Sequence, residues 1–138
     1  MIYEAQESDL PFIMEVAAYS YGWSNTSLGN QWVKERIKDS NSVVIRGDHS
    51  FGIGFLFRSF YWKKPRGHIL HVASIPKGLS REPLRIMQRI IDWAKNRDAF
   101  EVTFGSEIGT DYAPFAKLLG ASPQAPSYVI RFERGQYA

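Results

Sequence analysis

Residues 68–97 read HILHVASIPKGLSREPLRIMQRIIDWAKNR, and this stretch decides the fold. Its first eight residues predict a strand. This strand ends at Pro76, because proline has no N–H group to donate to a neighbouring strand. Apolar residues then recur at helical spacing between 81 and 97, at positions 84, 87, 90, 91 and 94. This change from strand to helix predicts a domain in which both kinds of element pack together.

The segments on both sides extend the pattern. Upstream, we expect a strand at 2–6, helices at about 11–20 and 28–38, and strands at 42–46 and 51–62. Downstream, we expect a strand at 100–104, a helix at 111–119 ended by Gly120, and a last strand at 127–133. The sequence therefore predicts a single α/β (α+β) domain over residues 1–138. Its sheet is mixed, mostly antiparallel, of about six strands, and is flanked by four helices.

The composition excludes several classes of protein and site. The chain has no cysteine, which excludes disulfide scaffolds, thiol nucleophiles and cysteine-based zinc sites, and we expect no metal. No apolar run approaches the roughly 20 residues that span a bilayer, and the N-terminus lacks the features of a signal peptide. We therefore expect a cytoplasmic protein with no membrane partner. The net charge of +3 favours an anionic ligand but falls short of the clustered basic surface of a nucleic-acid binder.

Three stretches carry a resemblance to a known family. They are IYEAQESDL at 2–10, the strand end at Ile75-Pro76, and FAKLLGA at 115–121 followed by SYVIRF at 127–132. Together with the order of elements, they resemble the GNAT superfamily of N-acetyltransferases from Met1 to about Arg134. The resemblance implies acetyl-CoA as co-substrate and a small-molecule or protein amine that attacks the thioester directly. A fainter resemblance, in FAKLLGA, is to small virus-encoded proteins of this fold.

The resemblance implies a cofactor site along the strand that ends at Pro76. In this family the backbone of that strand pairs with the pantetheine arm of the cofactor. Here the backbone N–H and C=O groups in question belong to Val72, Ala73, Ser74 and Ile75.

A row of cations at the start of the next helix predicts a site for the cofactor phosphates. Arg81 and Arg85 recur at i, i+4, Lys77 lies just ahead, and a helix N-terminus favours anions. The alternative is a solvated helix face on which Glu82 pairs with Arg85.

Three residues are candidates for acid–base chemistry. Tyr112 shares a helix face with Ala116, where the family has its catalytic tyrosine, so its hydroxyl can protonate the leaving thiolate; the alternative is packing. His71 can remove a proton from the amine, although a strand histidine that is simply half-buried and hydrogen-bonded is the favoured alternative. His68 is expected on the opposite strand face from His71. Glu107 is a weaker candidate base.

Departures from the family pattern keep other functions open. Glu82 and Leu84 replace the glycines of the cofactor loop, and Gly109 and Ala116 replace the usual asparagine and tyrosine. The first hypothesis is an N-acetyltransferase, the second a catalytically degenerate protein with a binding, structural or assembly role, and the third, disfavoured, a nucleic-acid binder. Aromatic residues flank the loop that covers the acceptor pocket in this family: Tyr19, Tyr21, Trp23 and Trp32. The aromatic strand at 51–62 has a second apolar face, which suits either an acceptor wall or the surface of a homodimer.

Overall fold

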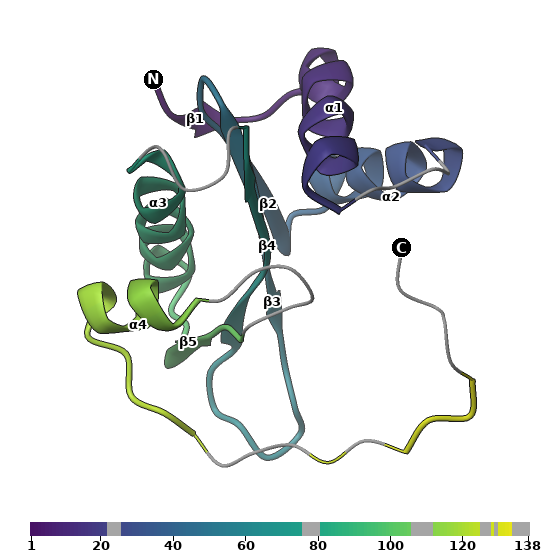
Figure 1. The fold of residues 1–138 in the computed structure, drawn as a ribbon. Coiled ribbons are helices and arrows are strands. Elements are labelled where there is room, and N and C mark those ends of the chain that lie inside the picture. The colour runs from purple at the N-terminus through teal and green to yellow at the C-terminus, as the bar shows by residue number, and fades with distance from the viewer. Residues whose placement is uncertain (22–25, 76–80, 106–111, 125–127, 129, 134–138) are drawn as a thin grey trace.

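Figure 1 shows the computed structural model, which describes residues 1–21, 26–75, 81–105, 112–124, 128 and 130–133. Five strands and four α-helices lie in this part of the chain. In chain order the elements are β1 (Tyr3–Glu4), a short 3-10 helix (Glu7–Asp9), α1 (Leu10–Tyr21), α2 (Thr26–Lys38), β2 (Ser42–Arg46), β3 (Ser50–Phe57), β4 (Arg66–Ser74), α3 (Glu82–Asn96), β5 (Glu101–Thr103) and α4 (Ala113–Leu119). None of the described helices is long and apolar enough to cross a membrane.

The sheet follows the chain, with strand order β1-β2-β3-β4-β5. The first three pairings are antiparallel, and β4 pairs with β5 in parallel through the crossover helix α3. The predicted fold class is confirmed, because the sheet is mixed and mostly antiparallel and four helices flank it. The aromatic strand is shorter than expected, since β3 ends at Phe57.

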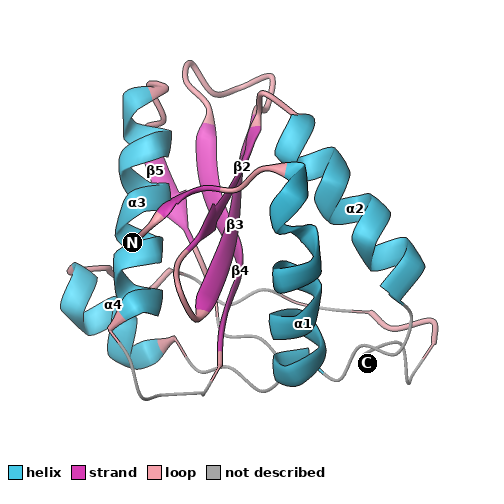
Figure 2. Cartoon of the chain, turned by 90° about the horizontal axis from the view of Figure 1, so that it is seen from above, coloured by secondary structure: helices cyan, strands magenta, loops and turns pink. Residues whose placement is uncertain are grey.

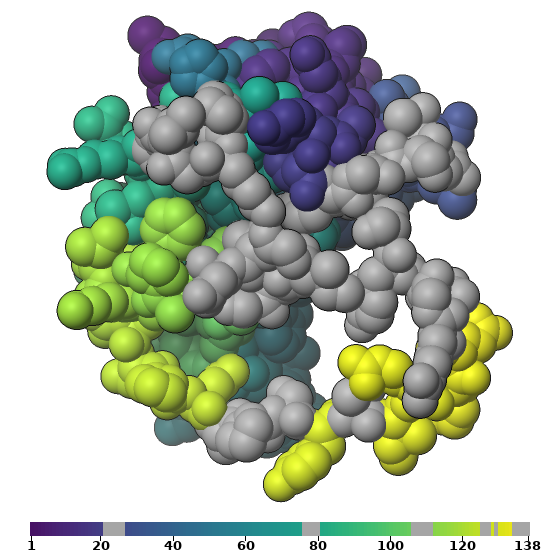
Figure 3. Space-filling view, in the orientation of Figure 1, coloured from purple at the N-terminus to yellow at the C-terminus, as the bar shows by residue number. Residues whose placement is uncertain are grey.

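The expected last strand does not form at the described residues of 127–133. Tyr128, Ile130 and Phe132 are 96%, 83% and 94% exposed. The described residues of this segment, at the yellow end of the colour bar, lie at the periphery in the space-filling view (Figure 3). Alternation of apolar residues creates a strand only where a neighbouring strand and a core receive them, and neither contact exists for these side chains. The sheet therefore has five strands rather than about six.

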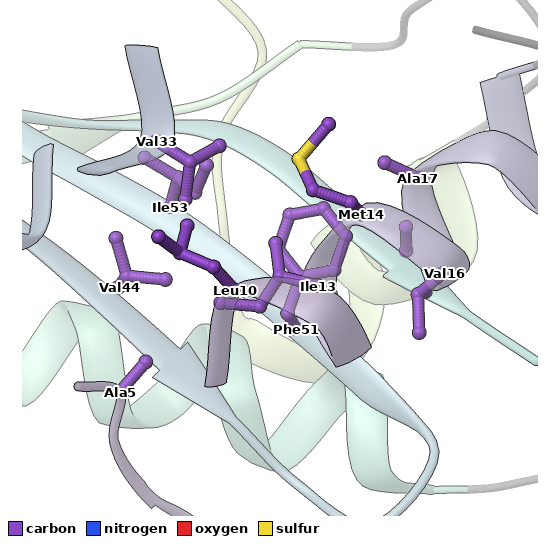
Figure 4. Packing of buried hydrophobic residues seen from close by; sticks show 11 residues of the cluster. Ala5, Leu10, Ile13, Met14, Val16, Ala17, Val33, Val44, Phe51 and Ile53 are labelled. Atoms are coloured by element: carbon purple, nitrogen blue, oxygen red, sulfur yellow. The ribbon is translucent and has the colours of Figure 1, made fainter. Parts of the chain in front are cut away.

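Helices cover both faces of the sheet (Figure 2). On the α1 and α2 side, the side chains of Ile13, Val33 and Ile53 are fully buried in one apolar cluster (Figure 4). On the other side, α3 and α4 enclose a second cluster around Ile86 and Ile90. The strands between these clusters are apolar on both faces, which explains their nearly continuous hydrophobic sequence.

Two glycines on β3 let α3 lie close against the sheet. A Cβ atom on Gly52 would stand 2.5 Å from Cγ2 of Ile86, and a Cβ atom on Gly54 would stand 2.4 Å from Cγ2 of Ile90. Both distances are far below van der Waals contact, so only glycine fits. Gly52 and Gly54 form a glycine strip on the face of β3 that meets α3. This strip sets how closely Ile86 and Ile90 of α3 approach the strand.

The carboxylate of Glu82 ties the first turn of α3 to the turn between β2 and β3. Its Oε1 accepts hydrogen bonds from the backbone N–H of His49, at 2.8 Å, and from the hydroxyl of Ser50. Gly47 makes room for this carboxyl group, because a Cβ atom there would overlap it. The residue that replaces a family glycine therefore has a structural partner, and it does not pair with Arg85 in the described part of the chain.

The pKa of the Glu82 carboxyl reflects these contacts. Burial raises it, but the hydrogen bonds from Ser50 and from the backbone N–H groups of His49 and Asp48 outweigh burial, and the net shift is below the ordinary value of 4.5. A carboxyl with a lower pKa in the folded state stabilises the fold above its unfolded pKa. This stabilisation is lost as the pH falls through the folded pKa.

We predict that Glu82→Gln lowers the free energy of unfolding by about 1 kcal/mol at pH 7, because a hydrogen-bonded charge is lost. The difference from the unmodified protein should shrink as the pH falls below the ordinary carboxyl pKa of 4.5 and through the lower pKa of the folded state, where the carboxyl becomes protonated. Urea unfolding between pH 3 and pH 7 measures both quantities. Glu15→Gln, on the exposed face of α1, is the control, and a difference for Glu82→Gln that is constant with pH would contradict the assignment.

A second prediction concerns the glycine strip. Gly54→Ala should lower the free energy of unfolding by roughly 1–3 kcal/mol, because its methyl group must displace Ile90. Gly105→Ala is the matched control, since a Cβ atom at Gly105 meets nothing within 4 Å and should change stability by less than about 0.5 kcal/mol. Equal effects of the two substitutions in thermal unfolding would show that α3 can move away from β3 at little cost.

Candidate active site

Strands β4 and β5 pair over three residues and then part. Their register runs from Arg66 with Glu101 to His68 with Thr103, whereas β4 continues to Ser74. No described strand pairs with residues 69–74 on the side where β5 has diverged. This edge of β4 is where the sequence predicts the cofactor-binding backbone.

A β-bulge interrupts β4 just inside this opened edge. Ile53 of β3 stands opposite His71, and Gly54 stands opposite Ile69, so Leu70 is an extra residue in β4. The bulge shifts the alternation of side chains by one residue. Bulges are common next to active sites because they redirect side chains, and this one separates the paired half of β4 from the open half.

The bulge overturns the prediction that His68 and His71 lie on opposite faces. The ring of His68 contacts Phe55 and its Nδ1 lies 2.8 Å from the Thr103 hydroxyl, on the side of the sheet opposite α3. His71 contacts Trp32 of α2 edge to face, with ring centroids 6.1 Å apart, on that same side. Strict alternation would have separated them, but the extra residue turns His71 toward α2.

Tyr112 reaches the opened edge of β4 from the start of α4. Its side chain is only 2% exposed, and its ring packs against Phe104 and Phe115. Its hydroxyl oxygen accepts a hydrogen bond of 3.2 Å from the backbone N–H of Val72. The hydroxyl therefore lies at the backbone group that the sequence assigned to the pantetheine arm.

A cavity lies between β5 and α4, next to Tyr112. Its volume is about 590 Å³, within the usual range for small-molecule sites. Ala116, at the position of the family's tyrosine, lines it, so the small side chain leaves space there. The other lining residues are 101–105, Tyr112, Ala113 and 121–124.

A second cavity opens on the opposite face, between α2 and β4. Its volume is about 500 Å³, and Trp32 and His71 are among its lining residues. His71 and Val72 are consecutive in β4, so this cavity and the hydroxyl of Tyr112 approach the strand at adjacent residues. Two candidate residues that are far apart in sequence, Trp32 and His71, are thus brought together.

The predicted cofactor residues divide into three groups. Val72 faces the opened edge through its N–H, and the N–H of Ser74 points the same way because backbone groups alternate along a strand. Ala73 packs in the apolar cluster on the α1 side. The N–H of Ile75 donates to the carbonyl of His49 at 2.8 Å, so only its C=O group remains a candidate for the pantetheine arm.

Two of the three predicted phosphate-binding cations, Arg81 and Arg85, lie within the described residues. Arg81 precedes the first turn of α3, and Arg81 and Arg85 are both exposed. In the described part of the chain neither guanidinium forms an ion pair, so the paired face considered as the alternative is not present at Arg85. Lys77 and Glu107 lie outside the described residues, so their predicted roles stay predictions. No group of three or more His, Asp or Glu among the described residues could hold a metal ion.

No family model matches the sequence, and no curated protein matches it. Solved structures do. A Trypanosoma brucei acetyltransferase matches with a TM-score of 0.78 at 14% identity, covering 96% of this chain and 99% of that one. Glucosamine-6-phosphate N-acetyltransferase from Arabidopsis thaliana gives 0.75 at 16%, over 96% and 98%. Ribosomal-protein-alanine N-acetyltransferase from Brucella melitensis gives 0.74 at 16%, over 96% and 99%. At these identities the likeness concerns the fold, and the chain has the fold of these acetyltransferases.

Proposed function

We propose that the chain binds acetyl-CoA and transfers its acetyl group to an amine. The observation that carries this proposal is the edge of β4, which continues to Ser74 beyond the end of β5 at Thr103 and meets the Tyr112 hydroxyl at the N–H of Val72. Tyr112 also lines the cavity of about 590 Å³ between β5 and α4. Solved N-acetyltransferases share the surrounding fold. A strand edge offers backbone N–H and C=O groups to an extended ligand that carries amides of its own.

The residues present suit the cofactor at both of its ends. The backbone of Val72 and Ser74 would pair with the pantetheine arm in exchange for its present partners, which include the Tyr112 hydroxyl on the N–H of Val72 and the Ser20 hydroxyl on the C=O of Ser74. Ala73 and Ile75 pack against the α1 side. Arg81 and Arg85 offer exposed cations to the phosphates near the start of α3, and Lys77 is assigned to them as well. The dipole of α3 adds to this attraction.

Attack by the amine needs few dedicated side chains. The amine nitrogen bonds to the thioester carbonyl carbon, the C–S bond breaks, and the electron pair leaves with the thiolate sulfur. His71 accepts the proton that the amine loses, and Tyr112 can donate a proton to the thiolate. A thiol has an ordinary pKa of about 8.5, so the thiolate leaves readily and transfer is slowed rather than abolished without an acid. Glu107 stays an alternative base.

A second candidate function is cofactor binding without turnover. One observation favours it, the hydrogen bond between the Tyr112 hydroxyl and the N–H of Val72. A ligand that pairs with this N–H must displace the Tyr112 hydroxyl from it, so the hydroxyl then loses the position from which it would serve the thiolate. A catalytically degenerate protein with an assembly role would bind coenzyme A but release no thiol.

Calorimetric titration with acetyl-CoA tests binding directly. Arg81→Glu should weaken binding at least about tenfold, near 1.4 kcal/mol, and leave thermal stability nearly unchanged because the side chain is exposed. Lys95→Glu, an equal change of charge at the other end of α3, is the matched control and should leave the affinity unchanged. Unchanged affinity in Arg81→Glu would assign the cationic row to solvation.

The variant Tyr112→Phe separates the two candidate functions. It keeps the ring that packs on Phe104 and Phe115 but removes the hydroxyl. If Tyr112 is the acid, thiol release with a panel of amines should fall roughly tenfold or more although acetyl-CoA binds at least as tightly, because the competing hydroxyl is gone. Equal rates would remove Tyr112 from the mechanism. Tight binding with no thiol release from the unmodified protein would favour the non-catalytic function.

A further inference from the structure

The cavity between α2 and β4 has an acidic and aromatic lining in a chain whose net charge is +3. Its lining residues are Leu28, Gly29, Gln31, Trp32, Glu35 and His71. None of these described lining residues is a lysine or an arginine, and Glu35 is the one carboxylate among them. The local charge is therefore opposite in sign to that of the whole protein, and it favours a cation.

The carboxylate of Glu35 is held in place but is not neutralised. The side-chain amide of Gln31 donates a hydrogen bond of 3.1 Å to its Oε1. Within the described part of the chain, Glu35 makes no ion pair, whereas the neighbouring Arg36 pairs with Asp39 at 3.5 Å. The guanidinium of Arg36 also lies 5.5 Å from the centroid of the Trp32 ring, so this cation is engaged by Asp39 and the indole and forms no ion pair with Glu35 in the described part of the chain.

Trp32 provides the apolar wall of the cavity. Leu28, Trp32 and Glu35 are spaced i, i+4 and i+7 on α2, so they share one helix face. The indole is half-buried against the core and meets the ring of His71, while Leu28 is 73% exposed and extends the apolar surface outward. An indole attracts an ammonium group over its face and packs flat against an aromatic or aliphatic body.

We propose that this cavity binds the acceptor, and that the acceptor is a primary amine on an aromatic or aliphatic body that carries no anionic group. The inference rests on the proposed acetyl transfer, since it names the substrate of the same site. The ammonium form is attracted by Glu35 and the apolar body packs on Trp32 and Leu28. His71, at the floor of the cavity, takes the proton, and Val72 beside it faces the edge assigned to the thioester. A carboxylate or phosphate on the amine is repelled by Glu35.

Two probes that differ by one carboxylate test the proposal. Phenethylamine carries an ammonium group and an aromatic ring, and phenylalanine adds a carboxylate to the same skeleton. The indole N–H signals of the four tryptophans are followed by NMR during titration, with and without saturating coenzyme A. A Trp32→Phe variant identifies the signal of Trp32. We expect phenethylamine to shift this signal and to bind at least about tenfold more tightly than phenylalanine.

The variant Glu35→Gln should weaken phenethylamine binding about fivefold to tenfold and reduce its advantage over phenylalanine. Glu15→Gln, on the exposed face of α1, is the matched control and should change neither. Equal binding of the two probes, or no shift of the Trp32 signal with or without coenzyme A, overturns this inference while leaving acetyl-CoA binding intact. Binding of phenethylamine without thiol release would instead refute the acetyl transfer and retain the amine site.

Discussion

The contact between α3 and β3 is the constraint on which the rest of the structure depends. Gly52 and Gly54 leave β3 without side chains where Ile86 and Ile90 of α3 approach, so the helix has one depth at which it fits. Glu82 then fixes the position of α3 along its axis by binding the turn between β2 and β3. Because α3 is the crossover between β4 and β5, its position decides where these strands pair and where they part.

Much of this fold could be predicted from sequence, because its helices and strands differ in period. The helix over 81–97 and the meander over 42–76 follow from the spacing of apolar residues, and the structure confirms both, although the aromatic strand ends at Phe57 and not at Trp62. The last strand could not be predicted in this way. Tyr128, Ile130 and Phe132 alternate like a strand, but pairing depends on a neighbour that local sequence does not specify.

The candidate site was predictable in its residue types and not in its geometry. Tyr112 and His71 were identified by their positions in the sequence. In the structure the Tyr112 hydroxyl contacts Val72, the residue of β4 that follows His71. The catalytic roles of both residues stay predictions. The bulge at Leu70 was missed because no glycine or proline marks it, and it reversed the expected face of His71. The partner of Glu82 was also missed, although Gly47-Asp48 signals a turn whose N–H groups need an acceptor.

Of the six described residues that line the α2 cavity, five belong to α2 and one, His71, belongs to the sheet. The edge of β4 at Val72 draws on different elements, β5 and α4. Exposed positions such as Leu28 and Glu35 can mutate without disturbing the glycine strip or the opened edge. Because of this separation, the exposed residues of α2 can change independently of the rest of the fold. Descendants of one ancestral gene can diverge in the surface of this helix while inheriting the same sheet, and rapid drift of such a helix erodes sequence similarity faster than fold.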